Sequence, residues 1–227
     1  MRQVRACARR LPFDLFRFPF DLSRVGVVPD PAVRYAARMA HYREAAWKLL
    51  CEWTENVNLR KHALAVEAAM RAHARRLGAD EDAFGTVGLL HDFDYEKNPT
   101  AETHPFAGAK VLREQGWPEA WVRAIEGHAD YTGVPRDTDM ARCLFAVDEL
   151  TGFLTAATLV RPDKTVANVP VESVLKRMKD KAFARSVNRD DIRRGADEIG
   201  MDLAAHIAFV RDAMASVAAG LGLAGAP

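Results

Sequence analysis

The sequence has few of the features that mark specialised classes of protein. Its 227 residues include only three cysteines, Cys7, Cys51 and Cys143. Because they are scattered singly, they predict neither a disulfide framework nor a CxxC zinc site, and a reducing cytoplasm fits best. The longest apolar stretch, residues 144–160, is interrupted by Asp148 and Glu149. It therefore predicts a buried helix and not a membrane span.

Net charge and aromatic residues are also scarce. The formal net charge is +1, and aromatic side chains make up 8% of the residues. A balanced charge argues against a protein wrapped in nucleic acid, and we predict neither a nucleic-acid nor a membrane partner. Hydrophobic residues at 49% and charged residues at 28% are ordinary for a soluble globular protein. The length suits one well-filled domain with an appendage.

The first 38 residues differ from the rest of the chain. They contain eight arginines against three aspartates and show no long helical period in the first thirty. An arginine-rich start is typical of some targeting segments, although the apolar core of a secretory signal is missing. We favour an extension outside the domain. The predicted organisation is an extension over 1–38, a domain over 39–219 and a frayed Ala/Gly-rich tail over 220–227.

From residue 31 onward apolar residues recur at helical spacing, and no useful period-2 alternation appears. The fold prediction is therefore all-α, a helical bundle. Capping residues, glycines and prolines set the expected bounds. The predicted helices run over 39–53, from Asn58 to Leu77, from Asp80 into His91, from His104 to Gly116, from Pro118 to His128, from Asp137 to about Val160, and near 171–178, 190–199 and 202–219.

Side chains that can bind a metal stand at the ends or on the buried faces of these helices. An apolar run ends in the doublet His91-Asp92, and imidazole with carboxylate suits zinc, iron or manganese. His62 lies on the apolar stripe of its helix. Asp148 sits among apolar residues, where an unpaired carboxylate is costly. Taken alone, His62 fits a core histidine and Asp148 an arginine-paired carboxylate. His73 is about 16 Å further along the helix of His62, too far to share its metal, and we interpret it as structural or exposed.

The order His62 … His91-Asp92 … Asp148 resembles the H…HD…D signature of the HD-domain superfamily of metal-dependent phosphohydrolases. The stretch LLHDFDYEKNP…HPFAGAKVLREQGWPEAWVRAIEGHADYTGVP resembles its extended form, which adds two histidines. The resemblance covers about residues 40–215 and implies an HD-domain bundle with a metal site in its core. It implies that His62, His91, Asp92 and Asp148 hold a first metal. It also implies that His104 and His128 hold a second metal, with Asp92 bridging.

Other interpretations of the two added histidines stay open. His104 fits a helix N-cap, and His128 fits a cation at a helix C-terminus. The segment after His128 lacks the full HHE…GYP pattern of the cyclic-di-GMP phosphodiesterase subgroup, which disfavours that substrate. The resemblance leaves one or two divalent transition metals possible, among Mn, Fe, Zn, Co and Ni.

The function implied by the resemblance is hydrolysis of a small phosphoester or nucleotide through a metal-activated water. We expect Asp94 to donate the proton to the leaving oxygen, with Glu96 and Asp130 as other candidates. The small anionic substrate also needs cations. Residues 161–189 carry eight basic against three acidic side chains, and we choose Lys181 and Arg161 as phosphate contacts. A solvated helix face is the alternative explanation of that charge.

Two further functions compete with phosphoester hydrolysis. The ligand set also resembles HD-type mixed-valent di-iron oxygenases, which cleave C–C or C–P bonds. A non-catalytic, metal-stabilised binding module is the third possibility. The sequence leaves the substrate, the metal and the oligomeric state open.

Overall fold

The structure is a computed structural model that describes residues 31–225. The predicted N-terminal extension therefore lies, up to residue 30, outside the described residues. Internal contacts divide the chain into two units, Met1–Ala37 and Arg38–Pro227. The second unit carries every candidate site residue, and the description below concerns that unit.

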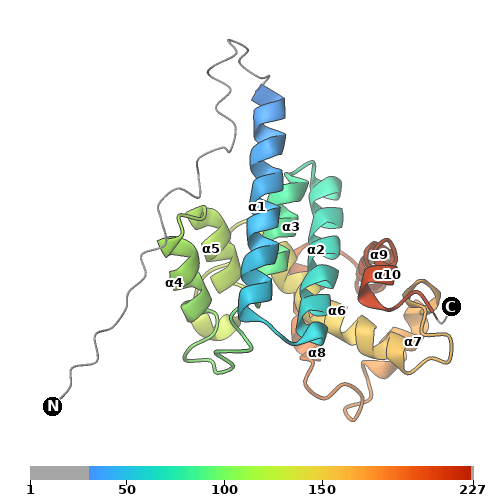
Figure 1. Cartoon of the computed structure of the whole chain (residues 1–227). Coiled ribbons are helices and arrows are strands. Elements are labelled where there is room, and N and C mark those ends of the chain that lie inside the picture. The colour runs from blue at the N-terminus through green and yellow to red at the C-terminus, as the bar shows by residue number, and fades with distance from the viewer. Residues whose placement is uncertain (1–30, 226–227) are drawn as a thin grey trace, which may run out of the picture. The chain divides into compact units, whose positions relative to one another are not determined.

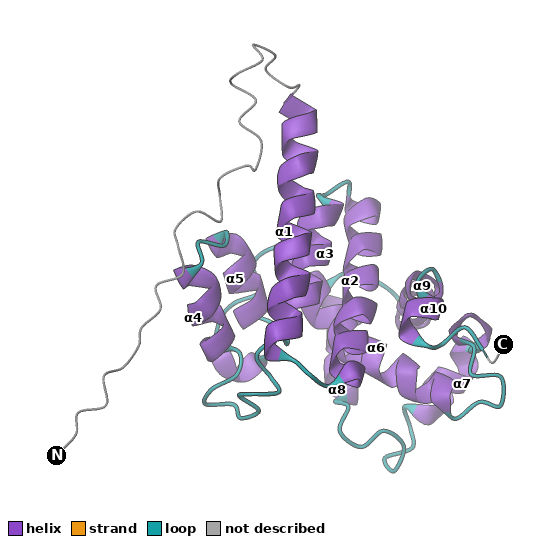
Figure 2. Ribbon diagram, viewed as in Figure 1, coloured by secondary structure: helices purple, strands orange, loops and turns teal. Residues whose placement is uncertain are grey.

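Every regular element in the described residues is a helix, which confirms the all-α prediction (Figures 1 and 2). A single bridge between Thr165 and Ala224 is the one extended pairing within residues 31–225. The ten α-helices of this part of the chain are α1 Pro31–Trp53, α2 Val57–Leu77, α3 Glu81–Leu90, α4 Phe106–Glu114, α5 Glu119–Glu126, α6 Asp139–Leu159, α7 Val171–Arg177, α8 Arg189–Glu198, α9 Leu203–Ala215 and α10 Ala218–Leu221.

The capping residues explain where the helices begin and end. Asp80 caps α3 by accepting hydrogen bonds from two backbone N–H groups, as expected, and Gly78 ends α2 in the left-handed conformation. Several helix ends differ from the prediction, most of them by one or two residues. The largest difference is at α1, which begins at Pro31 and not at residue 39. Asn56, not Asn58, caps α2. The helix after His104 begins at Phe106 with Pro105 at its cap position, so His104 lies in the preceding turn.

Helix α2 is the element against which the others assemble. It packs against α3, α6 and α9, and α6 in turn packs against α8 (Figure 1). Fully buried side chains such as Met70 and Phe153 fill the space between them. Helices α4 and α5 form a neighbouring pair, and α5 contacts both α3 and α6. This packing brings α2, the end of α3 and α6 together.

The chain does not fray at residue 220, contrary to the prediction. Leu221 and Leu223 are buried, and the Val166 N–H donates a 2.9 Å hydrogen bond to the Leu223 carbonyl. The sequence around these two leucines consists mainly of alanine and glycine, so their burial was not predicted. None of the described helices combines the length and the apolarity needed to cross a bilayer.

Candidate metal centre

The six predicted ligands come together in two groups that share one carboxylate. His62 from α2, His91 and Asp92 at the end of α3, and Asp148 from α6 form the first group. Asp92, His104 and His128 form the second. Within each group the candidate ligand atoms all lie within 4.8 Å of one another. The chain therefore contains a cluster of histidines and aspartates that can bind metal ions.

Local hydrogen bonds aim the histidine rings at the centre of the cluster. The Nδ1 atoms of His91 and His128 lie 2.8 Å and 2.5 Å from the carbonyl oxygens of Gly88 and Ile125. A carbonyl can only accept, so each Nδ1 carries a proton, and each Nε2 has a free lone pair whenever its ring is neutral. In both cases the acceptor lies three residues earlier, at the end of the same helical turn. Holding one ring nitrogen in this way is the usual support for a metal-binding histidine.

The free Nε2 atoms face one another in pairs. His62 Nε2 lies 3.2 Å from His91 Nε2, and His104 Nε2 lies 3.3 Å from His128 Nε2. Two lone pairs at this distance repel each other unless a cation stands between them. Ligands about 2.0–2.1 Å from one tetrahedral ion are separated by about 3.3 Å, so the observed spacing fits the donor set of a transition metal.

Asp92 faces both groups with different atoms. Its Oδ2 lies 3.4 Å from His91 Nε2 and 3.9 Å from His62 Nε2. Its Oδ1 lies 3.2 Å from His104 Nε2 and 3.5 Å from His128 Nε2. Asp148 belongs only to the first group, with Oδ1 3.0 Å from His62 Nε2. Asp92 is thus shared by the two groups of candidate ligands.

The charges of the cluster act strongly on one another. Burial opposes the charged form of His91, yet the charge of Asp92 prevails and holds the pKa of His91 well above its usual value. Burial likewise opposes the charge on His104, but hydrogen bonds to Asp92 and Asp94 raise its pKa to about 9. Despite burial, the neighbouring histidines keep the pKa of Asp92 well below its usual range. The carboxylates of the cluster therefore favour positive charge beside them, which protons on the histidine rings or a bound metal ion can supply.

Asp94, expected to be the proton donor, is placed differently. It is buried at 1% exposure, with Oδ1 2.8 Å from His104 Nδ1 and Oδ2 accepting a 2.8 Å hydrogen bond from the Gly108 N–H. It does not line the cavity over the cluster. Both oxygens are engaged behind His104, which suits orienting that ring better than delivering a proton to a substrate.

A cavity of about 590 Å³ opens over the cluster. Five of the six candidate ligands line it, and His91 lies beneath them, fully buried. The volume is within the range typical of sites for small molecules. The aromatic side chains of Tyr95, Tyr131 and Phe145 also line the cavity, although their contribution was not predicted from the sequence.

The expected phosphate contacts do not reach this cavity. Lys181 is exposed on the turn before α8, and Arg161 is paired with Asp163 at 2.8 Å. Neither lines the cavity. The same basic segment does contribute to the wall, through the neutral residues 186–188. Those predicted roles for Lys181 and Arg161 are not supported by their positions, because charge counted along a loop does not reveal which side chains turn inward.

The other two proton-donor candidates also differ in position. Glu96 accepts hydrogen bonds from the backbone of Glu55 and Asn56 and lies outside the cavity wall. Asp130 does line the cavity, where it is bound by Arg136 and Arg194. Its pKa stays below the usual value because these hydrogen bonds outweigh its burial.

Two acidic residues of the wall were missed as site residues. Glu149 follows Asp148 on α6, and Asp191 lies in the first turn of α8. Burial, and then the charge of Asp148, raise the pKa of Glu149 to about 7. A cation held by Asp148 would remove the second of these causes. The position of Glu149 directly after a ligand was the one sequence signal that could have identified it.

Comparison of the chain with protein-family models, with curated proteins and with solved structures gave no match. The function must therefore be argued from the cluster and its cavity.

Proposed function

We propose that the chain is a metal-dependent phosphohydrolase of the HD-domain superfamily that acts on small phosphate esters. The observation that carries the proposal is Asp92, whose two oxygens face two different histidine pairs. Such a shared carboxylate suits two adjacent divalent ions, which is the arrangement used for in-line displacement at phosphorus. The order of the ligands along the chain supports the superfamily.

Each ligand has a defined part in this proposal. His62, His91 and Asp148 would hold one ion, His104 and His128 the other, and Asp92 both. Bound there, the ions would supply Lewis-acid activation of a water molecule and neutralise phosphoryl charge. Water adds to phosphorus, the P–O bond to the alcohol breaks, and the alcohol oxygen takes up a proton. The products are inorganic phosphate and the free alcohol.

The side chains around the ligands orient them for this reaction. Asp94 fixes the ring of His104, and the carbonyls of Gly88 and Ile125 fix His91 and His128. The Thr151 hydroxyl donates to the backbone carbonyl of Asp148 and its oxygen lies 3.4 Å from His62 Nδ1, so it can accept a hydrogen bond that orients the His62 ring. Tyr95 and Tyr131 also line the cavity, where both side chains remain exposed.

The competing proposal is a mixed-valent di-iron oxygenase. A set of four histidines and two aspartates suits iron as well as manganese, so the same cluster supports it. The third possibility, a metal-stabilised binding module, needs the cluster but no turnover.

One experiment separates these functions. The full chain is purified without chelator, its metals are quantified, an EPR spectrum is recorded, and phosphate release from a panel of esters is followed in air and under nitrogen. We expect about two ions per chain and phosphate release that is indifferent to oxygen. In Asp92→Ala both the metal content and the turnover should collapse, whereas Glu172→Gln, an exposed residue of α7, should keep both.

An iron pair with oxygen consumption and no phosphate release would replace the hydrolase with the oxygenase. Stoichiometric metal without any turnover would favour the binding module. Full metal content and full turnover in Asp92→Ala would refute the shared site itself.

A further inference from the structure

The wall of the cavity beyond the metal ligands is acidic. Asp130, Glu149 and Asp191 line it, in addition to the ligands Asp92 and Asp148. Among the described residues that line this cavity there is no lysine and no arginine. The ions of the proposed function would therefore be the main source of positive charge for a substrate.

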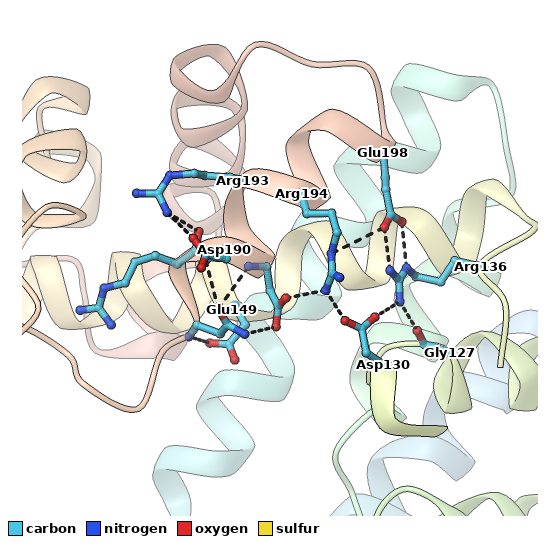
Figure 3. Close-up of polar contacts among 11 residues, drawn as sticks. Gly127, Asp130, Arg136, Glu149, Asp190, Arg193, Arg194 and Glu198 are labelled. Atoms are coloured by element: carbon cyan, nitrogen blue, oxygen red, sulfur yellow. Dashed lines mark hydrogen bonds and ion pairs between the residues drawn. The ribbon is translucent and has the colours of Figure 1, made fainter. Parts of the chain in front are cut away.

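The arginines closest to this wall are already occupied. Figure 3 shows Arg136 between Asp130 and Glu198, and Arg194 reaching from α8 to Asp130. Arg194 also contacts Asp191 at 2.5 Å. Asp130 and Asp191 are thus neutralised by cations on the outer side of the wall. Releasing either arginine to bind a substrate anion would leave a carboxylate unpaired.

Glu149 has no such partner. Its Oε2 accepts a 3.1 Å hydrogen bond from the Asn188 N–H, and no basic side chain contacts it within residues 31–225 (Figure 3). The residue is half-buried, next to the ligand Asp148, on the wall of the cavity. It is the one non-ligand acid of this wall whose charge is not balanced by a protein cation.

Resting on the proposed function, we propose that the substrate carries a single anionic group, the phosphoryl group, and that its other end presents a hydroxyl or ammonium donor to Glu149. A second anionic group would lie among carboxylates and be repelled. A donor would form a charge-assisted hydrogen bond to the free carboxylate oxygen. The substrate class is therefore phosphate monoesters of amino alcohols and polyols, and not bisphosphates, nucleoside polyphosphates or phosphorylated carboxylic acids.

A rival place for a second anion exists beside this cavity. A neighbouring cavity of about 370 Å³ shares His62 and Gly152 with it and contains Lys61. This lysine is half-buried and has no ion pair in the described part of the chain. If the substrate extended that way, Lys61 would favour a second anionic group, and the test must distinguish the two directions.

The test uses alkyl phosphates that differ only in their terminal group. Two matched series, of two and of four carbons, end in ammonium, hydroxyl or carboxylate. For each ester, kcat/KM is obtained from phosphate release by the metal-loaded full chain, and affinity is measured by calorimetry. We expect the carboxylate esters to be at least tenfold worse than the hydroxyl and ammonium esters in both measurements, the effect of about one well-placed charge.

Four variants, two at Glu149 and two elsewhere, assign the preference to a residue. Glu149→Gln should shrink the discrimination against the carboxylate by about tenfold, and Glu149→Lys should reverse it. The control Glu172→Gln, an exposed acid of α7, should leave every ratio unchanged. Lys61→Gln should likewise not alter the ratios. The proposal would be overturned if the unmodified chain gave the carboxylate esters a kcat/KM and an affinity equal to or better than those of the other esters. If Lys61→Gln then lost this activity toward the carboxylate esters, the neighbouring cavity would be the site of the second anionic group.

Failure of this proposal and failure of the proposed function give different results. Phosphate release with no Glu149-dependent preference would refute the substrate class and leave the hydrolase standing. If no ester released phosphate but the affinities measured by calorimetry still ranked the esters in a Glu149-dependent order, the hydrolase would be refuted. The role of Glu149 in selecting the terminal group of the ligand would then stand.

Discussion

Asp92 and Asp94 are two positions apart in the chain and differ in what their oxygens touch. Asp92 faces the free Nε2 atoms of the histidines, whereas Asp94 faces the opposite nitrogen of His104 and one backbone N–H. An ionised carboxylate can accept both of these hydrogen bonds. We therefore expect Asp94 to act by orienting His104 and not by contacting a substrate.

Replacing Asp94 by asparagine should weaken the second metal position. An amide has only one acceptor oxygen, so either the His104 ring or the Gly108 N–H would lose its partner. We expect the affinity of the position formed by His104 and His128 to fall about 10–100-fold, the usual effect of removing a support behind a ligand. Calorimetric metal titration of Asp94→Asn measures this loss.

The control for this titration is Glu96→Gln, two residues further along and outside the cavity wall, which should bind both ions normally. Unchanged affinity in Asp94→Asn would show that His104 does not depend on Asp94 for its orientation. Equal weakening of both positions would show a general loss of structure.

The six ligands could be predicted from the sequence because residue type and order were enough to identify them. Their roles needed more. Which nitrogen of His104 meets Asp94, and whether Lys181 turns inward, depend on the path of the backbone between helices. A segment can carry suitable charges and still not present them to the site: none of the basic side chains of residues 161–189 lines the cavity, although the neutral residues 186–188 do.

Among the helices, the contact between α6 and α8 is unusually close at Gly195. A Cβ atom on Gly195 would stand 2.6 Å from the Cα of Ala146. Backbone cannot yield as a flexible side chain does. The glycine therefore allows α8 to lie against α6 and to place Asp191 on the cavity wall.

The substitution Gly195→Ala should destabilise the fold by about 1–3 kcal/mol, the usual cost of overpacking. This cost outweighs the gain of up to about 1 kcal/mol from better helix propensity. Urea unfolding measures the difference.

Gly152→Ala on α6 is the matched control, because its Cβ would meet only Val187 Cγ2 at 4.0 Å. This control should be at least as stable as the parent chain. A stable Gly195→Ala variant with an unchanged unfolding midpoint would mean that the two helices have room to separate.

The existence of each helix was predictable, and most helix ends were predicted within a few residues, with the start of α1 at Pro31 as the exception. Asp80 and Gly78 were recognised because capping is local chemistry. The burial of Leu221 and Leu223 was not, since it depends on the carbonyl of Leu223 meeting the Val166 N–H across the molecule. Contacts distant in sequence leave no local signal.

For the molecule as a whole, the most consequential buried pair is His73 with His206. Both are fully buried, their ring centroids lie 5.4 Å apart, and their ring nitrogens have no hydrogen-bond partner in the described part of the chain. Burial lowers the pKa of His73 to about 4 and that of His206 to about 3, and Arg76 adds to both shifts.

These depressed pKa values predict acid lability. Between pH 6.5 and about 4 the unfolded chain binds protons at both histidines while the folded chain does not, so unfolding takes up protons and stability falls as the pH falls. The slope reaches about 1.4 kcal/mol per pH unit for each histidine. Above about pH 7.5 the pair contributes almost no pH dependence, because the histidines are then neutral in the unfolded chain as well.

Urea unfolding at several pH values between 7.5 and 4.5 tests this prediction. The double variant His73→Leu/His206→Leu should lose much less stability than the parent over that range. Because the metal centre is the same in both proteins, its own pH dependence cancels in the difference. Parallel curves for the two proteins would show that the histidines are not the origin of the acid lability.

The shared carboxylate of Asp92 has a consequence for how ions bind. If two ions bind as proposed, an ion at one position would act through this group on the affinity of the other, and thermodynamic linkage would require the second ion to act on the first by the same factor. A mutation at His104 would therefore change ion binding at His62, although the two histidines are connected only through Asp92. A dissociation constant for either position is defined only when the occupancy of its neighbour is stated.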